Sequence, residues 1–113
     1  MTTAFKIVDA AEWDAARAAG AYAGSAVDLQ DGYIHLSTAD QLEETARRHY
    51  AGREGLRLLE VDLDRLGAVK WEPSRGGALF PHQHGELPVA AVVGDRSLSV
   101  SADGVMIVGA TDA

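Results

Sequence analysis

The sequence of 113 residues contains no cysteine. Disulfide bonds, thiolate metal ligands and cysteine nucleophiles are therefore excluded. No apolar run approaches the roughly 18 residues that a membrane-spanning helix needs. The first residues also lack the basic region and apolar run of a signal peptide. Together these absences predict a cytoplasmic protein that has no membrane partner.

Positive charge is scarce as well. Ten Lys and Arg residues stand against seventeen Asp and Glu residues, which gives a formal net charge of -7. A broad DNA or RNA surface needs clustered positive charge, so none is expected. A small-molecule site needs only local positive potential. The expected partner is therefore a small-molecule ligand, and the oligomeric state is open between a monomer and a small homo-oligomer.

Three common functional motifs are missing. The chain has no P-loop and no dinucleotide-binding glycine fingerprint. It has no Gly-x-Ser-x-Gly elbow either, which argues against a serine hydrolase of that type. A nucleotide site in this chain must therefore be built from other residues.

The length fits one domain. We expect an α+β fold, with a bent or split, mostly antiparallel sheet and two helices in the N-terminal half. The helices are predicted at residues 10–19, anchored in the core by Trp13, and 39–51. The core is expected over residues 5–108, with 109–113 as a frayed tail. Strands are predicted at 5–8, 33–36, 56–61, 69–72, 88–93, 97–100 and 105–108.

Two segments are predicted to be irregular. Residues 22–30 contain glycine and serine breaks and are expected to form a loop, with Asp28 solvated rather than lining a pocket. Residues 79–88 contain two prolines, a glycine and two histidines. This composition predicts a shaped loop rather than a regular element.

The stretch Asp-Gly-Tyr-Ile-His-Leu-Ser-Thr at residues 31–38 is the most informative part of the chain. It predicts a turn, a short strand and then a helix N-cap at Thr38. The side chain of His35 should point to the face opposite Ile34 and Leu36. His35 is thus a candidate binding or catalytic group, and the alternative is a buried histidine bonded to a backbone carbonyl.

Three histidines form a second candidate group. His82 and His84 are two residues apart and would share one side of an extended segment. With His35 they could form a three-imidazole metal site with an open position, as in catalytic zinc centres. The alternative is that one of the pair hydrogen-bonds within its loop and the other is exposed. We assign no residue as a metal ligand.

Two glutamates and one glycine-rich loop complete the candidates. Glu72 and Glu86 could each act as a general acid or base, or stabilise a developing positive charge. Either could instead be a solvated loop acid. In the loop at 74–77, Gly76 and Gly77 allow backbone amides to approach a phosphate, and Arg75 supplies a bidentate donor.

Several of these residues together resemble a known family. The stretch at 31–38, then Trp71-Glu72, and Phe80-Pro81-His82 followed by Gly85, resemble domain-of-unknown-function family 952. The resemblance covers about residues 5–93. That family is in turn distantly similar to the ADP-ribosyltransferase superfamily, including its RNA 2′-phosphotransferase branch.

The resemblance implies a ligand and a set of roles. ADP-ribosyltransferases bind NAD in a cleft between two small sheets, with a strand-borne histidine on a ribose. His35, followed by Ser37, matches that first motif. The aromatic second motif is open between Tyr50 and Trp71. The third, a strand-borne Glu or Gln, is matched poorly.

The implied function is an NAD- or nucleotide-handling enzyme of ADP-ribosyl or glycosyl transfer type. Its third motif is open between Glu72 and Glu86, of which Glu72 is preferred. The alternatives are a non-enzymatic module that binds a small ligand in the same cleft, and the histidine metal site. The residues assigned to the site are, as catalytic groups, His35 and Glu72, and, as ligand-binding groups, Ser37, Arg75, Gly76, Gly77 and His82.

Overall fold

The computed structural model describes residues 2–111 of the chain. The helices within them are α1 (Ala10–Ala19), α2 (Ala26–Asp31) and α3 (Ala39–His49), with short 3-10 turns at Leu63–Arg65, Arg75–Gly77 and Val89–Ala91. The strands are β1 (Thr3–Asp9), β2 (Ala21–Tyr22), β3 (Ile34–His35), β4 (Leu56–Asp62), β5 (Val69–Pro73), β6 (Leu79–Gln83), β7 (Leu87–Pro88), β8 (Val92–Val100) and β9 (Met106–Thr111). The expected α+β fold is confirmed.

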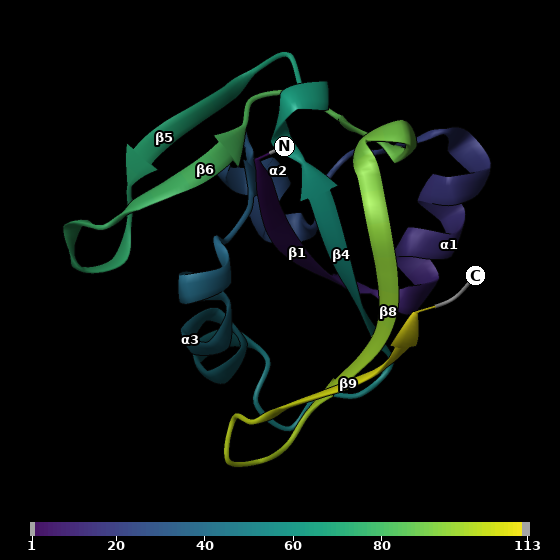
Figure 1. The fold of residues 1–113 in the computed structure, drawn as a ribbon, viewed down its shortest axis with the longest axis vertical. Coiled ribbons are helices and arrows are strands. Elements are labelled where there is room, and N and C mark those ends of the chain that lie inside the picture. The colour runs from purple at the N-terminus through teal and green to yellow at the C-terminus, as the bar shows by residue number, and fades with distance from the viewer. Residues whose placement is uncertain (1, 112–113) are drawn as a thin grey trace.

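The strands form a split, antiparallel arrangement (Figure 1). The main sheet has the order β1-β4-β8-β9, a second sheet has the order β3-β6-β5, and β2 and β7 form a separate two-stranded pair. The β5–β6 hairpin projects away from the main sheet. Phe5 and Ser37 join the two sheets, because the amide of each donates to the carbonyl of the other, at 2.7 and 2.9 Å. The free edge of β1 is thus tied to the end of β3.

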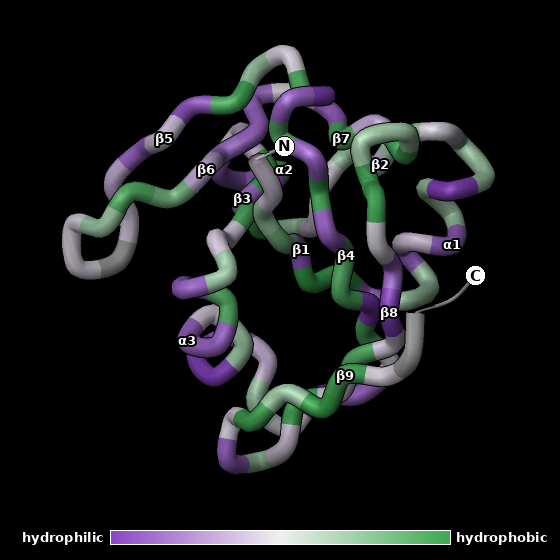
Figure 2. The backbone as a smooth tube through the Cα atoms, in the orientation of Figure 1, coloured by the Kyte–Doolittle hydropathy of each residue, from purple (hydrophilic) through white to green (hydrophobic). Residues whose placement is uncertain are grey.

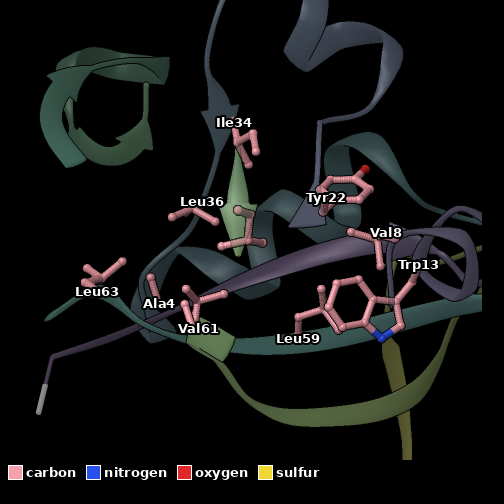
Figure 3. Packing of buried hydrophobic residues seen from close by; sticks show 12 residues of the cluster. Ala4, Val8, Trp13, Tyr22, Ile34, Leu36, Leu59, Val61 and Leu63 are labelled. Atoms are coloured by element: carbon pink, nitrogen blue, oxygen red, sulfur yellow. The ribbon is translucent and has the colours of Figure 1, made fainter. Parts of the chain in front are cut away.

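Alternation along β1 gives the main sheet two buried faces. Ala4 and Val8 point to one face, where they pack with Leu59, Val61 and Trp13 (Figure 3). Trp13 is buried, so its predicted role as the anchor of α1 is confirmed. Its indole Nε1 donates to Asp95 of β8 at 3.0 Å, which satisfies the buried polar atom.

The opposite face of the sheet supports α3. Ile7 of β1 packs there with Leu42 and Ala46 of α3. In Figure 2 hydrophilic and apolar residues alternate along α3, as expected for a helix that buries one apolar stripe. The predicted capping box of Thr38 and Gln41 is present at its start.

The β8–β9 hairpin also contacts α3. Its turn lies at residues 102–104, as the sequence predicts, and Gly104 there has φ of 85°. A Cβ on Gly104 would lie 2.5 Å from Cγ and 3.0 Å from Cα of Arg47. The hairpin tip therefore rests directly on the helix backbone.

Two segments expected to be loops contain regular structure. Within 22–30 the chain forms α2, because Ser25 and Asp28 cap its start reciprocally. Within 79–88 it forms β6 and β7. Pro81 lies opposite Leu36, just beyond the end of β3, and its carbonyl accepts from the Leu36 amide. Its missing N–H therefore falls at the end of the β3–β6 ladder, where it removes no bond between paired strand residues.

Smaller differences concern element ends. The strand expected at 88–93 is divided into β7, a 3-10 turn and the start of β8. β9 continues to Thr111, past the expected start of the frayed tail, and the last two residues lie outside the described part. Among residues 2–111 no helix is long and apolar enough to cross a membrane.

The contact at Gly104 yields a test of the hairpin packing. Gly104→Ala should lower the free energy of unfolding by about 2 kcal/mol, because it adds both backbone strain and a clash. Gly32→Ala is the matched control, since Gly32 has the same φ of 85° but no atom within 4 Å of the point that a Cβ would occupy. Urea unfolding should show the smaller loss for Gly32→Ala, and equal losses would contradict the close packing on Arg47.

Candidate functional site

A cleft of about 580 Å³ runs along the free edge of β1, between β3 and α3. Such a volume is typical of small-molecule sites. Its apolar lining includes Phe5, Ile7, Leu36, Leu42 and Phe80. Its polar and charged lining includes Lys6, Glu12, Ser25, Asp28, Asp31, His35, Ser37, Thr45, His49, Tyr50, Arg53, Ser74 and His82.

Asp28 is the most heavily hydrogen-bonded acid of the cleft. Its carboxylate accepts from Lys6 Nζ at 2.9 and 3.1 Å, and faces His35 Nδ1 at 2.6 Å. It also accepts from the backbone amides of Ser25 at 2.9 Å and His35 at 3.1 Å. The expectation of a solvated Asp28 was wrong, because α2 turns this side chain inward onto Lys6.

Burial and hydrogen bonding have opposite effects on the ionisation of Asp28 and Lys6. Burial favours the neutral acid, but the hydrogen bond from His35, the charge of Lys6 and the Ser25 amide outweigh it, so the pKa of Asp28 is well below its usual value. For Lys6, burial lowers the pKa, and Asp28 opposes the shift. Asp28 is therefore an ionised anchor rather than a proton donor at neutral pH.

His35 lies half-buried in the cleft wall, with 32% of its side chain exposed. Its Nδ1 faces Asp28, and its Nε2 lies 2.9 Å from Oδ2 of Asp31. Both nitrogens can donate to these carboxylates at once only in the doubly protonated, positively charged ring. The fully buried alternative for His35 does not hold. Both ring nitrogens are paired with carboxylates, and Nε2, which faces the partly exposed Asp31, is the one that a ligand in the cleft could engage by displacing that contact.

Two of the other assigned residues line the same cleft. Ser37 is buried, and its hydroxyl lies 2.9 Å from that of Thr45 on α3. His82 is opposite His35 in the strand register, and the two ring centroids are 5.5 Å apart. The cleft thus brings together His35, Ser37 and His82.

Glu72 lies outside the cleft but contacts it through His82. Its Oε1 is 2.9 Å from Nδ1 of His82 and 2.7 Å from Nε2 of His84. The hydrogen bonds from His84 and from His82 lower the pKa of Glu72. Glu72 is therefore ionised and held at the back of His82, so it does not face a ligand in the cleft directly.

The two glycines of the predicted phosphate loop and Glu86 lie outside the cleft. Gly76 and Gly77 form an exposed turn with φ of 65° and 82° and do not line the cleft. Arg75 belongs to that turn. Glu86 is exposed and outside the cleft. Of the phosphate loop expected at residues 74–77, Ser74 lines the cleft, whereas the side chain of Arg75 lies outside the described part of the structure.

Of the two candidates for the aromatic motif, Tyr50 lines the cleft and Trp71 does not. The hydroxyl of Tyr50 donates to the carbonyl of Ile7 at 3.3 Å. Trp71 neighbours Glu72 on β5 and so points to the other face of the hairpin, 46% exposed. The geometry favours Tyr50.

Sequence reasoning missed Lys6, Asp31 and Arg53 as cleft residues. Lys6 sits in an apolar strand and is 22 positions from Asp28, so no local pattern links them. Asp31 precedes His35 by four residues, a spacing that could have been considered. Arg53 lies over the ring of Tyr50, with its Cζ 5.3 Å from the centroid.

The three-histidine metal hypothesis gains no geometric support. Within residues 2–111, no group of three or more metal-binding side chains is arranged to hold an ion. Nδ1 of His82 and Nε2 of His84 both point at the same Glu72 oxygen instead.

Comparison with known proteins places the chain in a family. The family model described as "Protein of unknown function (DUF952)" matches residues 7–94. The chain belongs to this family. The matched range contains the lining residues named for the cleft except Phe5 and Lys6. The predicted likeness of DUF952 to ADP-ribosyltransferases is not shown by this match and stays a prediction.

Solved structures support the same fold. The crystal structure of protein CC0527 from Caulobacter crescentus is 50% identical, covers 94% of each chain, and has a TM-score of 0.88. A solution NMR structure of CC0527 is 51% identical, covers 93% of this chain and 91% of that one, and has a TM-score of 0.81. A search of curated proteins found no match.

The buried pair allows a test of the cleft wall. Asp28→Asn should lower the free energy of unfolding by about 3 kcal/mol at neutral pH, because it leaves the Lys6 charge uncompensated. Urea unfolding measures the loss. Glu43→Gln is the control, since Glu43 is exposed on α3, and it should change stability by less than about 0.5 kcal/mol.

The lowered pKa of Asp28 predicts that the stability difference between wild type and Asp28→Asn depends on pH. The folded-state pKa of Asp28 lies below the unfolded value of about 3.9. Its stabilisation is therefore complete above that value and is lost as the pH falls toward the lowered pKa. The difference between wild type and Asp28→Asn should be smaller at about pH 3 than at pH 7. A difference that stays constant over this range would contradict the ionised anchor.

Proposed function

We propose that the chain binds a nucleotide of the NAD type in this cleft and transfers its ribosyl group, as an ADP-ribosyltransferase-like enzyme. The observation that carries the proposal is the position of His35. It sits on a strand of the smaller sheet, in the wall of a cleft that lies where the two sheets meet. This is the placement that the resemblance to ADP-ribosyltransferases implies for a ribose-contacting histidine.

The chemistry of the lining supports a nucleoside. Phe5, Leu36 and Phe80 offer apolar surface for a planar ring. Ser37 and Thr45 add hydroxyls that can bond to sugar hydroxyls. Arg53 contributes positive charge at the end of α3, which suits a phosphate.

The proposal moves the carboxylate role from Glu72 to Asp31. When nicotinamide leaves a ribosyl carbon, positive charge develops on the sugar, and a nearby carboxylate stabilises it. Asp31 lines the cleft beside His35 and is 39% exposed. Asp28 is committed to Lys6 and His35. We choose Asp31 over the third cleft carboxylate, Glu12, because Asp31 lies beside the ribose-contacting His35.

Binding without turnover is the second candidate. It is favoured by the completeness of the existing hydrogen bonds, since both nitrogens of His35 already face carboxylates. A site so fully ordered binds a ligand with little rearrangement. Product formation distinguishes the two functions.

Calorimetric titration with NAD is the first test. The wild-type chain should release or take up heat at about 1 mM NAD, and His35→Asn should weaken binding about tenfold or more by removing the donor to the ribose. Absence of both heat and a thermal shift would reject the nucleotide site.

Chromatographic assay of nicotinamide release is the second test. Asp31→Asn should lower the rate about 100-fold, because the variant loses the charge that stabilises the cationic sugar, while its affinity changes little. Asp14→Asn, at an exposed position of α1 outside the cleft, is the matched control and should leave both unchanged. Binding with no nicotinamide release from wild type would favour the non-enzymatic module.

A further inference from the structure

Four side chains behind the cleft form one hydrogen-bonded and stacked cluster, which we call the His82 cluster: Tyr33, Glu72, His82 and His84. One oxygen of Glu72 lies within 2.9 Å of a ring nitrogen from each of the two histidines. The ring of Tyr33 stacks on His82 with centroids 4.1 Å apart and an interplanar angle of 24°. It also contacts His84 at 5.2 Å and His35 at 4.7 Å.

The strand register explains why these residues meet. His82 on β6 pairs with His35 on β3 and with Lys70 on β5. Glu72 follows Lys70 by two residues and therefore points to the same face as Lys70 and His82. One side of the second sheet thus carries Lys70, Glu72 and His82 together with Phe80, and the other carries Trp71.

The hydrogen bonds determine which nitrogen of His82 carries the proton. Glu72 is ionised and can only accept, so Nδ1 of His82 must donate to it. Within residues 2–111, no hydrogen bond to Nε2 of His82 is found, and the residue as a whole is only 1% exposed. His82 is a lining residue of the cleft, and with the proton on Nδ1 the acceptor of its neutral ring is the lone pair of Nε2.

The surroundings keep the ring neutral. Burial lowers the pKa of His82, the hydrogen bond from Nδ1 to Glu72 opposes this, and the electrostatic effect of the neighbouring His35, and then of His84, adds to the lowering. Lys70, beside it on β5, is a further positive group on the same face. Tyr33 covers one ring face without adding a charge at neutral pH, because burial raises its pKa.

We propose that His82 is the proton acceptor of the cleft and that Glu72 is the residue that positions it. The role rests on the proposed ribosyl transfer. An acceptor hydroxyl, of water or an alcohol, gives its proton to Nε2 of His82 while its oxygen bonds to the ribosyl carbon. The bond from that carbon to the nicotinamide nitrogen breaks, and its electron pair leaves with neutral nicotinamide. His82 then returns the proton to solvent.

The arrangement gives the two histidines of the cleft different tasks. His35 lies between Asp28 and Asp31 and donates. His82 has a carboxylate at one nitrogen alone and accepts at the other. A general base requires this orientation, with the carboxylate behind the ring and the lone pair toward the reacting hydroxyl.

Imidazole ¹⁵N NMR of the ligand-free chain tests the positioning without any activity. In the wild type at pH 7.5, His82 should be neutral with its proton on Nδ1. Glu72→Gln should produce a mixture of the two tautomers, because an amide can either donate or accept at Nδ1. Glu86→Gln is the matched control, at an exposed position outside the cleft, and should leave the spectrum of His82 unchanged.

The pH profile of nicotinamide release tests the catalytic role. Glu72→Gln should lower kcat about 100-fold and leave KM within about threefold. Its acid limb should move to lower pH, because the carboxylate that raises the His82 pKa has been removed. Glu72→Asp keeps the negative charge and should recover part of kcat. This variant keeps the proposal testable if Glu72→Gln fails to fold.

The outcomes separate the two proposals. A proton on Nε2 of His82, or a charged ring at pH 7.5, overturns the role of His82 even if NAD binds and is cleaved. Unchanged kcat in Glu72→Gln overturns the positioning role. If wild type binds NAD but releases no nicotinamide under any condition, the proposed enzyme function fails and the acceptor role fails with it, while the NMR result still shows whether Glu72 orients the ring.

Discussion

The carboxylate of Asp28 holds three separate segments of the chain together. Through Lys6 it binds β1, through the Ser25 amide it closes the start of α2, and through His35 it fixes β3. A buried charge must be compensated, so moving any of these segments away would remove hydrogen bonds from the buried carboxylate. Together with the backbone bonds between Phe5 and Ser37, this group fixes the position of β3 against β1, and with it the cleft wall.

The two histidines of the cleft differ in the number of carboxylates that contact their ring nitrogens. His35 has one at each nitrogen, whereas His82 shares a single oxygen of Glu72 with His84. The two rings are paired across β3 and β6. In the proposed mechanism this difference in surroundings makes His35 a donor and His82 an acceptor.

Local patterns in the sequence predicted the elements whose signals are local. α1, α3 and the β8–β9 hairpin have caps or turn residues at the expected positions. α2 was missed because Val27 and Leu29 are exposed while Asp28 is buried, which is the reverse of a helical apolar stripe. β6 was missed because its proline suggested a break, and only the end of β3 makes that proline acceptable.

The candidate site was predictable to the extent that it depends on single strands. His35, Ser37 and His82 were identified as site residues, since each follows a recognisable strand or loop motif, and all three line the cleft. The acids were less predictable. Which carboxylate faces the ligand depends on contacts such as Lys6 with Asp28 and Glu72 with His82, which join segments distant in sequence or separate strands.

The contact between the β8–β9 hairpin and α3 has a consequence for the order of assembly during synthesis. α3 and the histidine-bearing strands are made early, but the helix rests on Val100 and Met106 and on the backbone at Gly104. These residues leave the ribosome after every residue that lines the cleft. A nascent chain therefore carries all the groups of the site before it has the support that holds one wall in place, and ligand binding should appear only after the last strand has joined the sheet.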